Sequence, residues 1–376
     1  MMVQNRKVHT AVVLQGGGAL GAYEYGILRA LYEQRPGFRP AAVAGISIGA
    51  VTAAVLAGAK TDPIAALDRL WREEFVVSPP RPIDRLVPAR IERHLAVLGN
   101  PGMYRTNPAL FTTPWTAMSL YDTTPLRRIL TELVDPDKLN GEEPQAIVGA
   151  TNVGTGEMEF FDRRCPGGLT FDHVIASGSL PPGFPMTAIG EQRYWDGGLF
   201  SNLPLTPAIN ALHQAGNGDR SAIRELIVVE LFPMSAPIPH TMPEVLQRMV
   251  QLQYTSRLKL DKLYFEEIDR FVDLMAKIDE QLPRRSKVRR DPTYQALLAS
   301  RKIDRFCVVT SSLPAELSHA SDFSRSTIEA RIRAGHDDAI AQGIGHVGVE
   351  TPSQDHRRST VLRRWVRQHW GSSRTA

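Results

Sequence analysis

Residues 41–59 form a run of nineteen positions without a charged side chain, and this run constrains the fold more than any other segment. Its length is that of a membrane span, but it is rich in alanine and glycine, whereas leucine, isoleucine and phenylalanine favour insertion. Two glycines also interrupt it, on either side of Ser47. We therefore predict a buried strand at 42–45, a tight turn, and a helix of small residues at 48–58.

The same alternation of strand and helix extends along the chain. Apolar and β-branched runs predict further strands at 8–14, 145–152, 157–162, 225–232 and 305–310. Helical spacing predicts helices at 18–34, 61–75, 125–134, 171–177, 206–214, 243–282 and 324–342. This alternation predicts an α/β fold, a three-layer α/β/α sandwich around a mainly parallel sheet, with a mostly helical C-terminal extension.

The composition is that of an ordinary globular protein. Of the 376 residues, 43% are hydrophobic and 22% are charged. The two cysteines, Cys165 and Cys307, are too few for a disulfide framework, which favours a reducing compartment. The apolar run at 11–14 is too short for a secretory signal. We expect a cytoplasmic protein with no signal peptide and no transmembrane helix.

The central chemical motif is Gly45-Ile46-Ser47-Ile48-Gly49, a G-x-S-x-G pattern between the predicted strand and helix. In this context the sharp turn exposes the serine hydroxyl, and the flanking glycines allow the backbone to reverse. The helix that follows directs its N-terminus at Ser47, where it favours negative charge. Small residues also occur in purely structural turns of this kind, so both interpretations of the motif stay open when it is taken alone.

A second motif, Gly16-Gly17-Gly18-Ala19-Leu20-Gly21, follows the first predicted strand. Consecutive glycines at such a turn can present backbone N–H groups to an oxyanion. The same residues satisfy G-x-G-x-x-G, which is typical of dinucleotide binding. That fingerprint requires an acidic residue about 20 positions further on, and residues 34–61 contain none. An oxyanion hole is therefore the favoured interpretation, with a nucleotide-binding module as the alternative.

A third motif is Asp196-Gly197-Gly198, after a predicted strand. Serine needs an adjacent base to act as a nucleophile, and two glycines would let Asp196 lie on a tight turn facing Ser47. An ordinary Asp-Gly turn is the alternative. A Ser–His–Asp triad also stays open, although His173, within a predicted helix, has no recognisable catalytic context. No metal-binding spacing is present, and we predict neither a metal nor a cofactor.

The ordered set of three motifs resembles the patatin-like phospholipase family over residues 8–210. The segment 176–181 and the positions of Asn202 and Pro204 after the D-G-G motif are also similar to that family. The resemblance implies a catalytic dyad of Ser47 and Asp196 and an oxyanion hole formed by the amides of three glycines. These glycines are Gly16, Gly17 and Gly18, and the remaining motif glycines are Gly21, Gly45, Gly49, Gly197 and Gly198.

Two departures from the family pattern occur in the first motif. Gln15 stands where the family often has Asp, and Leu20 stands where it has a basic residue. We expect these differences to affect contacts with the lipid headgroup more than the chemistry. Residues after about 240 resemble a C-terminal extension of a bacterial subgroup of the family.

The domain organisation follows from changes in composition. We predict a catalytic domain at 8–232, an extension packed on it at 240–345, and a basic tail at 346–376; a cluster of prolines marks the boundary near 233–243. Within the first domain, residues 76–124 are rich in proline and aromatic residues. This insertion is either a lid or acyl-chain wall, or a passive packed loop.

The combined prediction is a serine hydrolase of phospholipids or other lipid esters that works through an acyl-enzyme intermediate. An acyltransferase using the same serine is one alternative, because another alcohol can compete with water. An idle lipid-binding scaffold is another. The tail, with six arginines and no acidic residue after position 356, predicts contact with anionic membranes, and its competing interpretation is a solvated surface. No nucleic-acid partner is predicted.

Overall fold

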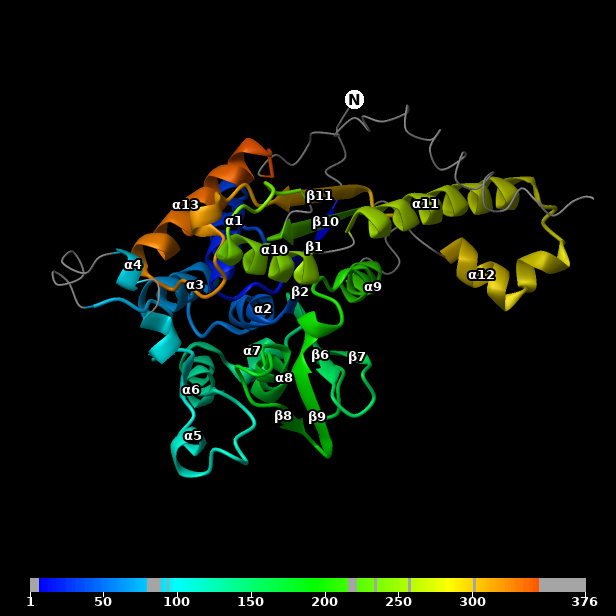
Figure 1. Ribbon diagram of the computed structural model, residues 1–376. Coiled ribbons are helices and arrows are strands. Elements are labelled where there is room, and N and C mark those ends of the chain that lie inside the picture. The colour runs from blue at the N-terminus through cyan, green and yellow to red at the C-terminus, as the bar shows by residue number, and fades with distance from the viewer. Residues whose placement is uncertain are drawn as a thin grey trace, which may run out of the picture. The chain divides into compact units, whose positions relative to one another are not determined.

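The computed structural model describes residues 7–79, 89–92, 95–215, 222–232, 235–255, 258–299 and 302–344. Eight strands form one sheet in the order β11-β10-β1-β2-β6-β9-β8, and β7 pairs with β6 (Figure 1). The strands are β1 (Val8–Leu14), β2 (Ala42–Ile46), β6 (Gln145–Asn152), β7 (Met158–Phe161), β8 (Thr187–Ile189), β9 (Gln192–Asp196), β10 (Ile223–Glu230) and β11 (Arg305–Thr310).

The five strands from β11 to β6 are parallel, and β7 and β9 run antiparallel to β6. The parallel strands are joined by long connections that contain helices, because two parallel neighbours cannot be linked by a tight turn. Strands β6 and β7 are joined by a short turn and are therefore antiparallel. The helices of the sandwich are α1 (Gly21–Gln34), α2 (Ile48–Gly58), α3 (Pro63–Arg69), α6 (Thr124–Leu133), α7 (Pro136–Leu139), α8 (Phe171–Ser177), α9 (Leu205–Ala215) and α13 (Arg325–Ala341). The predicted α/β/α sandwich is confirmed.

Alternation along β1 explains the three layers. Ala11 and Val13 belong to the apolar cluster beneath α9, whereas Val12 and Leu14 belong to the cluster formed with α1, α2 and α13. Side chains of a strand point alternately to its two faces, and here both faces are covered, so β1 is apolar throughout.

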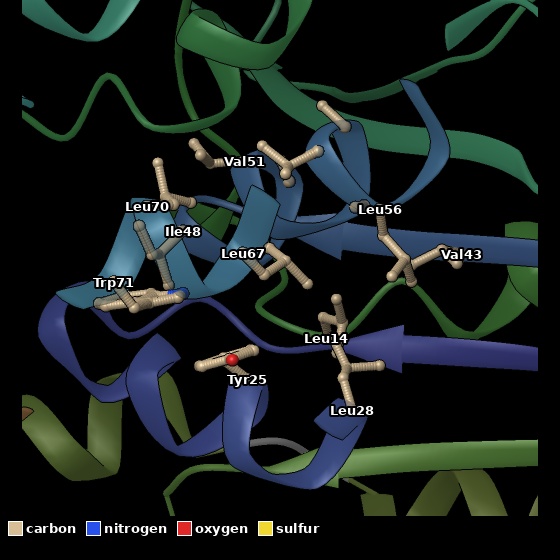
Figure 2. Packing of buried hydrophobic residues seen from close by; sticks show 14 of the residues in the cluster. Leu14, Tyr25, Leu28, Val43, Ile48, Val51, Leu56, Leu67, Leu70 and Trp71 are labelled. Carbon is tan, nitrogen blue, oxygen red and sulfur yellow. The ribbon is translucent and has the colours of Figure 1, made fainter. Parts of the chain in front are cut away.

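The larger core lies where α1, α2 and the segment after α3 meet. Figure 2 shows Trp71 beside Ile48 and Leu70, with Leu14 and Leu28 below them. Trp71 is fully buried and meets Phe75 edge to face, with ring centroids 5.4 Å apart. Burial of each such side chain contributes roughly 1.5–3 kcal/mol, which holds the start of α2 against the sheet.

The structure corrects two predicted helices. The segment 61–75 is helical only to Arg69 and continues as a π-helical turn at Leu70–Glu74. The single helix predicted at 243–282 is divided into α10 (Met242–Tyr254) and α11 (Leu258–Gln281), because Thr255 leaves helical geometry with a ψ of 126°. Helix propensity and the helical spacing of apolar residues continue past Thr255 in the sequence, so only the backbone angles reveal the break between the two helices.

The insertion after α3 contains a small antiparallel sheet. Its elements are α4 (Ala89–Glu92), a 3-10 turn (Leu95–Leu98), β3 (Gly99–Asn100), β4 (Tyr104–Thr106), α5 (Ala109–Thr112) and β5 (Tyr121–Asp122). The C-terminal extension contains α12 (Pro292–Ala299), and it also supplies β11 to the main sheet. The sheet therefore continues beyond the predicted domain boundary. The predicted basic tail, 346–376, lies outside the described residues.

Candidate active site

Ser47 occupies a sharp turn between β2 and α2. Its φ of 55° and ψ of −121° are conformationally costly for a residue with a side chain, and among the described non-glycine residues its φ is the one positive value. A Cβ on Gly45 would lie 2.1 Å from the carbonyl oxygen of Gly49, and one on Gly49 would lie 2.7 Å from that of Leu14. Close packing therefore requires both motif glycines. The Ser47 N–H donates to Ser177 Oγ at 3.0 Å.

Strand β6 brings Asp196 to Ser47. Gly149 pairs with Ile46 at the end of β2, and the next residue, Ala150, pairs with Asp196 at the end of β9. Strand β7 pairs with residues 148–151 along one edge of β6. On the opposite edge β2 pairs only as far as Gly149, and β9 pairs with the residues that follow. The ends of two strands far apart in sequence thus meet at adjacent positions of one neighbour.

The Asp196 carboxyl is buried, with 2% of the residue exposed. Burial raises its pKa from 3.8 to about 7, while hydrogen bonds from Ser47 and from the Gly198 N–H lower it. The Gly198 bond is 2.7 Å long. Burial dominates because a charged carboxylate loses its hydration there. The group therefore titrates near neutrality, which suits a general base.

The glycine-rich turn lies beside these two residues, since a Cβ on Gly16 would lie 2.9 Å from Ser47 Cβ. Gly16 is buried, and its N–H donates to Asn202 Oδ1 at 3.1 Å. Gly17 and Gly18 are half-buried, and Gly18 has a φ of 55°, which glycine adopts readily. Of the three predicted oxyanion donors, Gly16 is thus already engaged, which leaves Gly17 and Gly18.

Two of the remaining motif glycines act through close packing. A Cβ on Gly21 would lie 2.6 Å from the Trp71 ring, and one on Gly197 would lie 2.6 Å from the Gly149 carbonyl oxygen. They let α1 and the turn after Asp196 approach their neighbours.

Residues of the C-terminal extension support the glycine turn. The Ala19 N–H donates to the Ala320 carbonyl at 2.8 Å, and Arg331 Nη1 donates to the Ala19 carbonyl at 3.1 Å. Arg331 is fully buried and also donates to the carbonyls of Leu317, His319 and Asp322. A guanidinium from α13 therefore holds both the turn and the 317–322 segment.

The end of α10 makes a second link. The Tyr254 carbonyl accepts from Gln15 Nε2 at 3.0 Å and from Asn202 Nδ2 at 3.3 Å. Asn202 Nδ2 also donates to the Gly16 carbonyl at 2.8 Å. Burial raises the pKa of the Tyr254 phenol, and the nearby Asp196 charge raises it further. Asn202 thus connects the glycine turn, the D-G-G turn and the extension.

Sequence reasoning missed the contributions of four residues. Ser177 and Asn202 lie in segments that resemble the family, so the sequence indicated that these positions matter. It did not indicate which hydrogen bonds they make. Nothing in the sequence pointed to Tyr254 or Arg331, because only the folded chain places them near the glycine turn.

The Asp196 interactions involve no histidine among the described residues. His173 caps α8, since its Nδ1 accepts the Thr170 N–H at 3.0 Å, and its ring lies 4.5 Å from that of Phe161. Burial lowers its pKa. Within the part of the chain that the structure describes, no cluster of three His, Cys, Asp or Glu side chains is arranged for a metal, and no helix is long and apolar enough to cross a membrane.

Comparison with family models defines the class of the protein. A model described as patatin-like phospholipase matches residues 12–209, and one described as patatin phospholipase matches residues 252–342. These matches and the α/β sandwich place the chain among the patatin-type α/β proteins. The first match alone covers more than half of the chain, and the chain belongs to the patatin-like phospholipase family.

The solved structures that are similar to this chain have low sequence identity to it. VipD from Legionella pneumophila is 14% identical with a TM-score of 0.41; the match covers 89% of this chain and 66% of VipD, just under two thirds of its length. ExoU in its heterodimeric complex with SpcU, from the type III secretion system of Pseudomonas aeruginosa, is 16% identical with a TM-score of 0.28, covering 97% of this chain and 78% of that one. No curated protein matches the sequence.

Proposed function

We propose that this chain hydrolyses phospholipids or other lipid esters through a dyad of Ser47 and Asp196. The observation that carries the proposal is the buried Asp196 carboxyl, with a pKa of about 7, next to a serine on a strained turn. A carboxyl of ordinary pKa would be too weak a base, whereas a value near the working pH balances basicity against the deprotonated fraction.

In the proposed mechanism Ser47 Oγ attacks the ester carbonyl carbon and its proton passes to Asp196. The N–H groups of Gly17 and Gly18 bind the oxyanion, since the Gly16 N–H is engaged by Asn202. The alcohol or lysolipid leaves with the proton from Asp196. Water then attacks the acyl-enzyme, giving its proton to Asp196, and the fatty acid is released as Ser47 is restored.

An apolar groove beside the D-G-G turn supports a lipid substrate. Its lining includes Met158, Phe160, Phe200 and Leu203. Met158 also approaches Gly197, because a Cβ at that glycine would lie 2.9 Å from Met158 Cε. Three polar residues, Glu157, Ser201 and Thr206, also line the groove, and apolar walls with a few polar groups are typical of sites that bind molecules with long apolar parts. We propose that this groove receives an acyl chain.

The experiment compares hydrolysis of a soluble nitrophenyl ester by the natural chain and by Ser47→Ala and Asp196→Asn. We expect both substitutions to reduce kcat at least about 1,000-fold, since members of a catalytic unit fail together. A fluorophosphonate should label the natural chain but not Ser47→Ala. Ser326→Ala and Asp137→Asn, at exposed positions, are the matched controls and should retain activity. Turnover by Asp196→Asn close to that of the natural chain would refute the dyad.

A further inference from the structure

The insertion presents an apolar surface to solvent. Residues 107–120, here called the 107–120 loop, carry Phe111, Trp115 and Met118, whose exposed fractions are 80%, 82% and 72%. Leu98 and Val97, in the preceding 3-10 turn, are also exposed. Large apolar side chains gathered on one exposed segment mark a site of interaction rather than an ordinary surface.

Polar contacts at the base of the 107–120 loop hold it in one conformation. Asn107 Nδ2 donates to the Ser119 carbonyl at 2.9 Å, and the Asn107 N–H donates to the Leu120 carbonyl at 2.9 Å. Below this closure Tyr121 packs on the rings of Tyr104 and Phe184. The apolar tip is therefore displayed from a rigid base.

The base of the loop lies close to the candidate active site. The Leu120 N–H donates to the Pro182 carbonyl at 3.0 Å. Pro182 is three positions after Ser179, at most about 11 Å away in an extended chain, and the Ser179 carbonyl accepts the Asp196 N–H. Ser177, two residues earlier, accepts the Ser47 N–H. Figure 1 shows this region, in cyan around α5, next to α6 and α8.

The composition of the 107–120 loop suits insertion into a phospholipid surface. The loop contains no charged residue, and Arg105, just before it, pairs with Asp122 at 2.8 Å. Tryptophan and phenylalanine are suited to the boundary between headgroups and acyl chains, because their rings are large and apolar and the indole N–H is polar. A loop without charged side chains can enter the interface without desolvating a charge.

We propose that the 107–120 loop docks the enzyme on a phospholipid bilayer by inserting Phe111, Trp115 and Met118 at the interface. This inference rests on the proposed hydrolysis of lipid esters and identifies how the site reaches its substrate. Docking at the loop brings the bilayer surface next to the segment 177–183, which contacts both Ser47 and Asp196. A lipid can then enter the site from the membrane rather than from water.

The test measures binding of the full chain to sedimented vesicles of phosphatidylcholine and phosphatidylglycerol. We expect the double substitution Phe111→Ser and Trp115→Ser to weaken binding about tenfold or more, since two large apolar side chains no longer insert. Hydrolysis of vesicle phospholipid should fall in proportion, while hydrolysis of a soluble nitrophenyl ester stays within about twofold. Trp115→Phe should retain binding and show that the loop still folds.

Two control substitutions make the result specific. Ile340→Ser removes an exposed apolar side chain from α13, where the exposed fraction is 46%, and should leave binding unchanged. Met249→Ser removes one from the exposed face of α10 and should do the same. The proposal is overturned if the double variant binds vesicles as tightly as the natural chain does. It is also overturned if Met249→Ser alone loses binding. Because sedimentation requires no catalysis, the docking proposal is tested even if ester hydrolysis is absent.

Discussion

Replacing Asp196 by Asn should stabilise the fold at neutral pH while removing activity. Burial raises the pKa of this carboxyl from 3.8 to about 7. The folded chain therefore holds the proton more tightly than the unfolded chain, so its stability falls as pH rises between these values and levels off above about 7. At about 1.4 kcal/mol per pH unit, the deprotonated carboxylate costs the native state roughly 4 kcal/mol at pH 8.

Asparagine avoids this cost because it does not titrate, and its amide oxygen can still accept the Gly198 N–H. We expect the free energy of unfolding of Asp196→Asn, relative to the natural chain, to increase by roughly 4 kcal/mol from pH 4 to pH 8. Urea unfolding at a series of pH values measures it. Subtracting the natural chain at each pH cancels the titration of all other groups.

The matched control is Asp137→Asn, at an exposed position. Its stability relative to the natural chain should change little over the same pH range. A difference for Asp196→Asn that does not depend on pH, or a natural chain more stable than the variant at pH 8, would refute the assignment of a buried carboxyl with a raised pKa. In the same pH range kcat/KM of the natural chain should rise to a plateau above pH 7, since the base must be deprotonated.

Three further predictions concern the turn and its supports. Ser47→Gly should unfold at a higher temperature than Ser47→Ala, by about 1 kcal/mol of stability, because only glycine relieves the positive φ; equal melting temperatures would contradict the strain. Asn202→Ala should lower kcat about 10–100-fold on a soluble ester with little change in KM, because the Gly16 peptide loses both side-chain hydrogen bonds. Arg331→Met should destabilise the chain by about 3–5 kcal/mol, seen as a lower denaturant midpoint, because four carbonyls, two of them in buried hydrogen bonds, lose a charged donor.

Controls for these predictions come from residues of the same type outside the site. Asn107→Ala alters the base of the 107–120 loop and should leave kcat on a soluble ester unchanged, in contrast to Asn202→Ala. Arg128→Met removes an exposed arginine and should change stability by less than about 1 kcal/mol. A similar loss in Arg331→Met and Arg128→Met would show that the carbonyl contacts of Arg331 contribute little.

The local structure around Ser47 follows from the sequence. An uncharged run broken by two glycines can be a strand, a turn and a helix, and β2 and α2 begin and end within a residue of the predicted limits. The glycines at 45 and 49 indicate close backbone approach, and the structure shows what each approaches. Short-range sterics determine these features, so they can be read from neighbouring residues.

The meeting of the site residues is a tertiary result. Asp196 reaches Ser47 because β9 continues along the edge of β6 where β2 ends, a register that neither strand's own sequence specifies. The pKa of Asp196 depends on burial, which is a property of the assembled fold. Arg331 contacts the glycine turn because α13 packs on a layer that begins with α1, far earlier in the sequence, and Tyr254 reaches the residues beside that turn from the end of α10. Sequence patterns extend over a few turns of helix or one strand, whereas strand order and desolvation arise only when distant segments pack together.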